Sequence, residues 1–147
     1  MTDQTILLVE DNPDDEALMI RALRKNGIVN TIDVTRDGVE ALDYLFATGS
    51  FEKRDLRDIP QLILLDLKLP KIDGLEVLKR LRAEKHTLYI PVVVLTTSTE
   101  QRDIVVSYHF GANSFVNKPF DFNEFMEATR QLGTYWLLIN KPVPKND

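Results

Sequence analysis

Five short segments of the chain contain apolar residues in runs or at alternate positions, and longer segments with apolar residues at every third or fourth position separate them. Three of the short segments are apolar throughout, which is typical of strands buried on both faces of a sheet. Another alternates apolar and polar residues, as a half-exposed edge strand does. The pattern therefore predicts β-strands over residues 6–9, 31–35, 62–65, 92–95 and 114–117.

The longer segments predict helices, because their apolar residues share one face at the helical repeat. Pro13 and the acids after it suit the start of a helix, and Asn26-Gly27 suits its end. We expect Ala17 and Val39 to face the core, and the segment from Thr48 to Pro60 to form a long surface loop. The predicted helices span residues 14–25, 39–46, 75–81, 100–110 and 121–138.

Strands and helices alternate through five β-α units. This order predicts an α/β fold with a doubly wound parallel sheet, covered by helices on both faces. In such sheets the ligand crevice lies beyond the carboxyl ends of the strands, where the strand order reverses. If the order is 2-1-3-4-5, the loops after the first and third strands flank that point.

Composition narrows the chemistry of this domain. The 147 residues suit one domain; the absence of cysteine and the presence of only two histidines exclude disulfides, thiol catalysis and cysteine or histidine metal clusters. The net charge of −5 argues against nucleic acid as a partner. Because no apolar run approaches the ~18 residues of a membrane span and no signal peptide is apparent, we expect a cytoplasmic protein with no membrane partner.

Polar residues of different chemical types stand at the carboxyl ends of the predicted strands. Glu10 and Asp11 follow the first strand, and Asp66 follows the third. Thr96 follows the fourth strand and Lys118 the fifth. Since parallel strands end at one edge of the sheet, we expect these side chains to converge.

A divalent cation would resolve the repulsion among three neighbouring carboxylates. Mg²⁺ prefers oxygen ligands and keeps some of its water. We expect Asp11 and Asp66 to give one oxygen each and the backbone carbonyl of Lys68 to give a third. Glu10 would hold a coordinated water.

The same cluster suits phosphoryl transfer to a carboxylate, in which positioning and charge neutralisation provide most of the catalysis. With a cation on one side and Lys118 on the other, Asp66 could attack phosphorus in line. Thr96 could then donate a hydrogen bond to the bound phosphoryl group. Each residue alone is common at a strand end or in a loop, so solvated turn residues remain the alternative at this point.

Several motifs together resemble the receiver domain of two-component response regulators, over about residues 5–130. These motifs are Glu10-Asp11, Leu64-Leu-Asp66, Leu69-Pro70-x-x-Asp73-Gly74, Thr96 and Lys118-Pro119. The resemblance implies a flavodoxin-like sheet in the order 2-1-3-4-5, and Asp66 as the residue that accepts a phosphoryl group from a sensor histidine kinase. It implies the Mg²⁺ ligands named above, with Mn²⁺ or Ca²⁺ as substitutes.

The resemblance also assigns the residues that sense the phosphoryl group. It implies Thr96 and Lys118 as the sensing pair, a cis peptide bond between Lys118 and Pro119, and Phe115 as the switch aromatic. Phe115 lacks the hydroxyl that is often found at this position. Such a protein is a signalling phosphoacceptor and not an enzyme, although it catalyses its own phosphorylation and slow dephosphorylation.

Two features depart from a minimal receiver domain. Asp66 follows Asp11 by 55 residues, with the excess in the Thr48–Pro60 loop, and the chain continues past the last expected helix. Both features resemble the small regulators of phytochrome histidine kinases, so a phytochrome is the expected kinase partner. We expect a receiver domain at residues 1–131, followed at 132–147 by a helical extension and tail without an output domain.

The extension predicts a protein interface. Residues 135–139 are apolar in a row, which is too many for one face of a helix. Dense apolar clusters with aromatic residues are typical of interfaces, whereas we expect core packing to account for Phe125, Met126 and Leu132. We expect a homodimer through the last helix and its extension. The residues expected in that interface are Tyr135, Trp136, Leu138 and Ile139.

Other functions fit parts of the pattern. A flavodoxin-like FMN carrier shares the topology, but the acidic residues 10–15 would repel a flavin phosphate in the absence of a metal. A hydrolase of the haloacid dehalogenase type needs a second acid at position 68, where this chain has lysine. A receiver-like adaptor that never takes phosphate remains an alternative.

Overall fold

The computed structural model describes residues 4–144, which form a parallel five-stranded sheet in the order β2-β1-β3-β4-β5. The α/β class and the strand order are therefore confirmed. The strands are β1 (Thr5–Val9), β2 (Thr31–Thr35), β3 (Leu62–Leu65), β4 (Val92–Thr96) and β5 (Ser114–Asn117). The helices are α1 (Pro13–Lys25), α2 (Gly38–Phe46), α3 (Gly74–Arg82), α4 (Gln101–His109) and α5 (Phe122–Gly133), with a 3-10 helix η1 (Gly49–Phe51) and a π-helix η2 (Thr134–Ile139).

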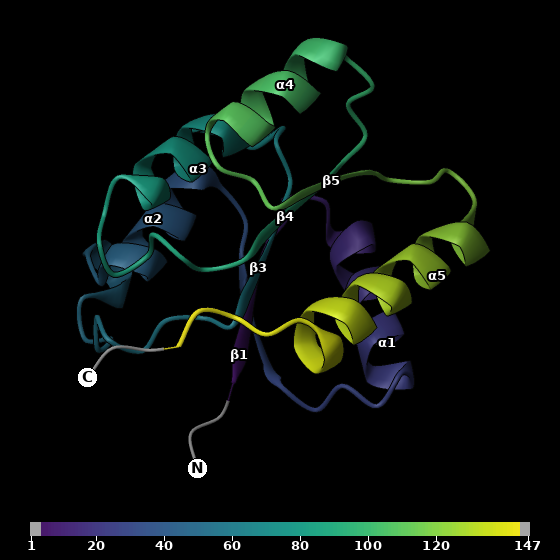
Figure 1. The fold of residues 1–147 in the computed structure, drawn as a ribbon, viewed down its shortest axis with the longest axis horizontal. Helices are drawn as coiled ribbons and strands as arrows, with labels where there is room; N and C mark the ends of the chain where they lie inside the picture. The colour runs from purple at the N-terminus through teal and green to yellow at the C-terminus, as the bar shows by residue number, and fades with distance from the viewer. Residues whose placement is uncertain (1–3, 145–147) are drawn as a thin grey trace.

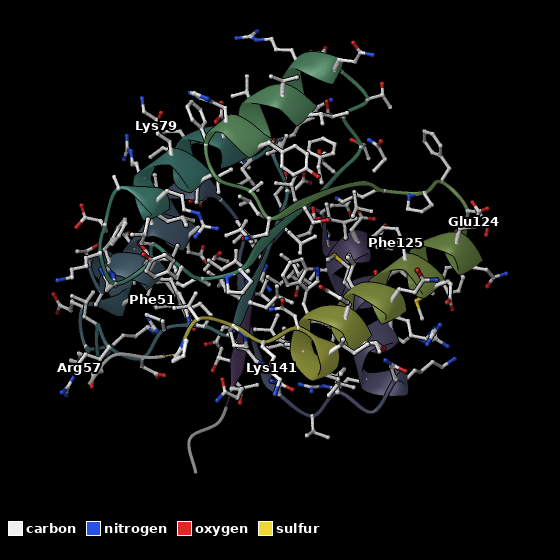
Figure 2. All side chains as sticks on the ribbon, in the orientation of Figure 1. Phe51, Arg57, Lys79, Glu124, Phe125 and Lys141 are labelled. Carbon is white, nitrogen blue, oxygen red and sulfur yellow. The ribbon has the colours of Figure 1, made fainter. Side chains whose placement is uncertain are left out.

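Helices cover both faces of the sheet, with α2, α3 and α4 on one side and α1 and α5 on the other (Figure 1). Successive residues of a strand point to opposite faces, so Leu7 packs under α2 and α3 whereas Leu8 packs under α1 and α5. Figure 2 labels Phe51 beside the first of these apolar layers and Phe125 within the second. No helix within residues 4–144 is long and apolar enough to cross a membrane.

Two residues expected to face the core are exposed. Ala17 lies on the outer side of α1, where Met19 and Leu23 are the buried residues. Because two residues turn a helix by about 200°, Ala17 and Met19 cannot share one face. Val39 begins α2 with 37% of its surface exposed, and Tyr44 is among the residues that α2 buries. Apolar character alone did not identify the inner face of these helices.

The Thr48–Pro60 loop is packed against α2 through Arg54. Its guanidinium lies 3.7 Å from the centre of the Tyr44 ring and donates to the carbonyl oxygens of Tyr44 and Asp58. Phe51 meets the same ring edge-on at 5.3 Å. These contacts give the long loop a defined position beside α2.

The last helix differs from the expected single helix over 121–138. The α-helical part ends at Gly133, and the backbone continues as the π-helix η2. Gly133 lies so close to α1 that a Cβ there would be 2.7 Å from Cδ2 of Leu23. Asn26 at the end of α1 donates to Oγ1 of Thr134 at 2.6 Å. Contacts with α1 therefore fix the place where the extension begins.

Candidate functional site

The ammonium group of Lys118 lies at the centre of a carboxylate cluster at the carboxyl edge of the sheet. Its Nζ lies 2.6 Å from Oε1 of Glu10, 2.9 Å from Oδ2 of Asp15 and 3.0 Å from Oδ2 of Asp66. The lysine side chain is only 4% exposed. The structure thus brings together three of the residues expected at the strand ends, and adds Asp15 from the first turn of α1.

Asp66 is held at the end of β3 by its own loop and by α3. Its Oδ1 accepts the backbone N–H of Lys68 at 3.2 Å, while its Oδ2 accepts from Lys118. A Cβ at Gly74 would overlap the carbonyl oxygen of Asp66, so glycine is what allows α3 to start this close. Lys68 therefore supports Asp66 through its N–H; the role of its carbonyl stays a prediction.

Asp11 completes a group of oxygen ligands on the solvent side of the cluster. Each of Glu10, Asp11 and Asp66 offers a carboxylate oxygen, and these oxygens all lie within 4.8 Å of one another. Glu10 and Asp66 are buried, whereas Asp11 is exposed. Three hard oxygen donors with one side open to solvent fit a divalent cation that keeps part of its water.

Burial and charge together set the protonation of this cluster. Burial raises the pKa of Glu10 from 4.5 to about 7, even though the hydrogen bond and charge of Lys118 act to lower it. Burial by itself lowers the pKa of Lys118, but the hydrogen bonds to Glu10 and Asp15 and the charge of Asp66 raise it above its ordinary value. Lys118 is therefore a permanent cation, and Glu10 is a carboxyl whose charge depends on its surroundings.

Thr96 ends β4 in a fully buried position. Its Oγ1 accepts the N–H of Ser98 at 3.3 Å, and its carbonyl accepts the N–H of Lys118 at 2.7 Å. Ser98 in turn donates to Oδ2 of Asp103 at 2.5 Å, and its carbonyl oxygen accepts from the side-chain amide of Asn117. The loop between β4 and α4 is therefore connected to α4 and to β5 through Ser98.

The expected switch residue, Phe115, lies half-buried on β5 and packs against the apolar layer under α2 and α3. Its backbone N–H donates to the hydroxyl of Tyr108 on α4 at 3.2 Å. Position 115 has no hydroxyl of its own, but a tyrosine hydroxyl from the neighbouring helix contacts its backbone.

The peptide bond between Lys118 and Pro119 is trans, as is every peptide bond across residues 4–144. The expectation of a cis bond is therefore wrong for this structure. The trans isomer is the favoured form even before proline, by about 0.5–1 kcal/mol.

Sequence reasoning missed the role of Asp15, because its position in the chain indicates only an acid suited to a helix start. The side chain of Asn12 caps α1 by accepting the N–H groups of Asp14 and Asp15, at 2.9 Å and 3.2 Å. Because α1 begins so soon after Asp11, its first turn overhangs the edge at which the strands end. The short connection between β1 and α1 was therefore the sequence signal that a carboxylate in the first turn of α1 could join the cluster.

The residues expected in an interface divide into two kinds. Tyr135, Leu138 and Ile139 are 47%, 67% and 60% exposed. Trp136 is half-buried against the layer under α1 and α5, and its ring meets that of Tyr135 edge-on at 5.1 Å. The exposed side chains of Tyr135, Leu138 and Ile139 are therefore available for contact with another molecule, whereas much of Trp136 is covered by the protein itself.

Known proteins share this sequence pattern over most of the chain. The family model of the response regulator receiver domain matches residues 6–130. The probable methanogenesis regulatory protein FilR2 of Methanothrix harundinacea is 40% identical over 136 residues, which cover 92% of this chain and 85% of that protein. The response regulator Rcp1 of Synechocystis is 36% identical over 134 residues, with coverage of 91% and 89%.

Solved structures resemble this fold along nearly its whole length. The phosphorylated cyanobacterial phytochrome response regulator RcpA gives a TM-score of 0.89 at 35% identity, covering 96% of this chain and 99% of that one. The Mn²⁺-bound form of Rcp1 gives the same TM-score at 34% identity and the same coverage.

Proposed function

The chain belongs to the response regulator receiver domain family, and on this basis we propose that Asp66 accepts a phosphoryl group from a sensor histidine kinase. One observation carries the proposal. Asp66 Oδ2 lies 3.0 Å from the buried ammonium of Lys118, and an oxygen of the same carboxylate lies within 4.8 Å of ligand oxygens of Glu10 and Asp11. The Asp66 carboxylate therefore lies beside both the positive charge of Lys118 and the oxygens that could bind a metal ion.

The transfer step is an in-line displacement. A carboxylate oxygen of Asp66 forms a bond to phosphorus while the phosphorus–nitrogen bond of a phosphohistidine breaks. The electron pair of that bond stays with the imidazole, which takes up a proton and leaves as neutral histidine. Lys118 would hold its positive charge against the phosphoryl oxygens throughout, because it is already at Asp66 before the donor arrives.

The metal expected here is Mg²⁺. When bound, it would supply further positive charge to the phosphoryl oxygens, and its ligands would be Asp11, Asp66, the Lys68 carbonyl and a water held by Glu10. The oxygen donor set supports this choice. The related protein Rcp1 has been solved in a Mn²⁺-bound form, which supports a divalent cation in this family.

Thr96 and Phe115 would respond to the negative charge of the phosphoryl group on Asp66 by moving, and so would change the surface near α4. The Thr96 hydroxyl accepts the N–H of Ser98 and would donate its own hydrogen to the phosphoryl group. Phe115, whose N–H is connected to Tyr108, would follow this movement and carry it to α4. A partner protein would then recognise the changed surface around α4. Such a switch requires only a new charged group and a structural element whose position that group alters.

The proposed kinase is a phytochrome in the cytoplasm, and the proposed assembly is a homodimer. Similarity to Rcp1 and to the phytochrome response regulator RcpA supports the phytochrome kinase. The exposed side chains of Tyr135, Leu138 and Ile139, which lie next to the partly buried Trp136, support the homodimer.

Phosphorylation of Asp66 is tested by incubating the protein with Mg²⁺ and either acetyl phosphate or a phytochrome histidine kinase that carries phosphate. We expect the intact mass to rise by one phosphoryl group, faster with the kinase, and Asp66→Asn to abolish the gain. The control is Asp55→Asn, which removes an exposed loop carboxylate paired with Arg57 and should react like the wild type. A wild-type protein that never gains the mass would instead support the adaptor alternative.

A further inference from the structure

The carboxylate of Asp15 is part of the Lys118 cluster but has no part in metal binding or in the transfer step described above. We propose that Asp15 is a positioning residue that holds Lys118 in the resting protein and gives it up when a phosphoryl group arrives on Asp66. The inference rests on the proposed function of Asp66.

All three N–H groups of the Lys118 ammonium are already committed. A lysine has three donors, and here its nitrogen lies within hydrogen-bond distance of Glu10, Asp15 and Asp66. The transfer step bonds one oxygen of Asp66 to phosphorus and leaves its other oxygen able to accept from Lys118. A phosphoryl oxygen can therefore receive a full hydrogen bond from Lys118 as well only if Glu10 or Asp15 is displaced.

Asp15 is the carboxylate that is easiest to displace. Its side chain is 21% exposed, compared with 2% for Glu10 and 8% for Asp66. An exposed carboxylate is hydrated by water when it loses its partner, whereas a buried one is left unpaired at a high cost in free energy. We therefore expect Lys118 to exchange Asp15 for the phosphoryl group and to keep Glu10.

The neighbouring Asp14 provides a matched control within the same helical turn. The Asn12 cap binds the backbone N–H groups of both residues, and both carboxylates stand at the positive end of the α1 dipole. Asp14 is exposed, whereas Asp15 is directed at Lys118. Replacement of either aspartate by asparagine removes one negative charge beside the site, but only Asp15→Asn removes a partner of Lys118.

The proposal has an equilibrium consequence. Asp15 and the phosphoryl group compete for Lys118, so removal of the Asp15 charge should favour the phosphorylated form. With beryllofluoride as the probe of that form, we expect Asp15→Asn to bind it about three- to tenfold more tightly than the wild type, the contribution of one partly exposed ion pair. Asp14→Asn and Asp15→Glu should stay within about twofold, since both retain a carboxylate that can reach Lys118.

The experiment is calorimetric titration of beryllofluoride into the wild type and the three variants at saturating Mg²⁺, with Mg²⁺ affinity measured separately. Tighter binding in Asp15→Asn alone supports the proposal. Equal affinity in Asp15→Asn and Asp14→Asn overturns it, because Lys118 then gives up another partner. If no variant binds the probe and the wild type also fails, the proposed function of Asp66 falls, and this inference falls with it.

A second measurement does not depend on phosphoryl binding. In the metal-free protein, the ammonium protons of Lys118 should exchange slowly with water while all three donate to carboxylates. NMR should detect faster exchange in Asp15→Asn and unchanged exchange in Asp14→Asn. Identical exchange in the two variants would show that Asp15 does not hold Lys118, and would overturn the proposal even if Asp66 accepts phosphate.

Discussion

At the scale of single residues, Glu10 couples protonation to stability. Its side chain is buried, and burial outweighs the bond to Lys118, so the pKa in the folded protein stands at about 7, above the ordinary 4.5. Between these two values the folded protein keeps a proton that the unfolded chain has lost. Protonated Glu10 therefore favours the folded state only while the pH is low enough to keep it protonated.

The metal-free protein should lose stability as the pH rises through this window. The contribution of Glu10 is fully present below pH 4.5 and is lost as the pH rises through about 7. We expect the free energy of unfolding to fall by about 1–3 kcal/mol across this range. Urea unfolding in a chelating buffer at both ends of the window measures the change.

The matched variant is Glu10→Gln, which keeps the shape of the side chain but does not titrate. It should remove most of the pH dependence within this window. If Glu10→Gln shows the same loss of stability as the wild type, another group is responsible.

At the scale of elements, Arg82 connects the end of α3 both to the loop that follows it and to the turn before β5, which is distant along the chain. Its guanidinium is partly buried, and burial lowers its pKa, yet its N–H groups are well supplied with acceptors. They donate to the carbonyl oxygens of Thr87 (3.3 Å), Leu88 (2.8 Å), Ile90 (2.8 Å) and Gly111 (3.0 Å) and to Oδ1 of Asn113 (2.9 Å). One side chain thus holds the α3–β4 loop against the turn that precedes β5.

Arg82→Ala should lower the free energy of unfolding by about 2–4 kcal/mol, because several partly buried carbonyl groups lose a charged donor. Urea denaturation followed by circular dichroism measures this effect. The control is Arg80→Ala in the same helix, whose guanidinium pairs with Glu76 on the surface; this pair should be worth no more than about 0.5 kcal/mol. Equal effects of the two substitutions would contradict a role for Arg82 in joining the loops.

At the scale of the whole molecule, the site and the extension lie at different ends. The carboxylate cluster stands at the carboxyl ends of the parallel strands, whereas α5 runs back toward their amino ends before η2 begins (Figure 1). A dimer through η2 would leave Asp66 accessible to a kinase. The exposed apolar side chains of Leu138 and Ile139 are the groups that such a dimer would cover.

Leu138→Asp should therefore convert a dimer into a monomer without reducing phosphorylation of Asp66. Sedimentation velocity at micromolar protein concentration, with and without phosphorylation, gives the oligomeric state. The control is Val29→Asp, which places the same charge at an 88% exposed apolar position between α1 and β2. A wild-type protein that is monomeric under both conditions would exclude the dimer.

The sequence by itself determined the fold class, the approximate positions of the strands and most of the site. Buried parallel strands must be apolar along their length, so β1, β3 and β4 stand out in the pattern. Since parallel strands end at one edge, residues that follow them, such as Glu10, Asp66 and Lys118, come together wherever the chain folds this way. These conclusions need only periodicity and topology.

Only the tertiary structure decided which groups contact one another across the fold. Asp15 lies 103 residues from Lys118 along the chain, and their 2.9 Å contact depends on where α1 sits above the sheet. The same holds for the contact of Gly133 with Leu23, which sets where α5 gives way to η2. Periodicity within one segment carries no information about such distances, because they depend on how separate elements pack and on which rotamers that packing allows.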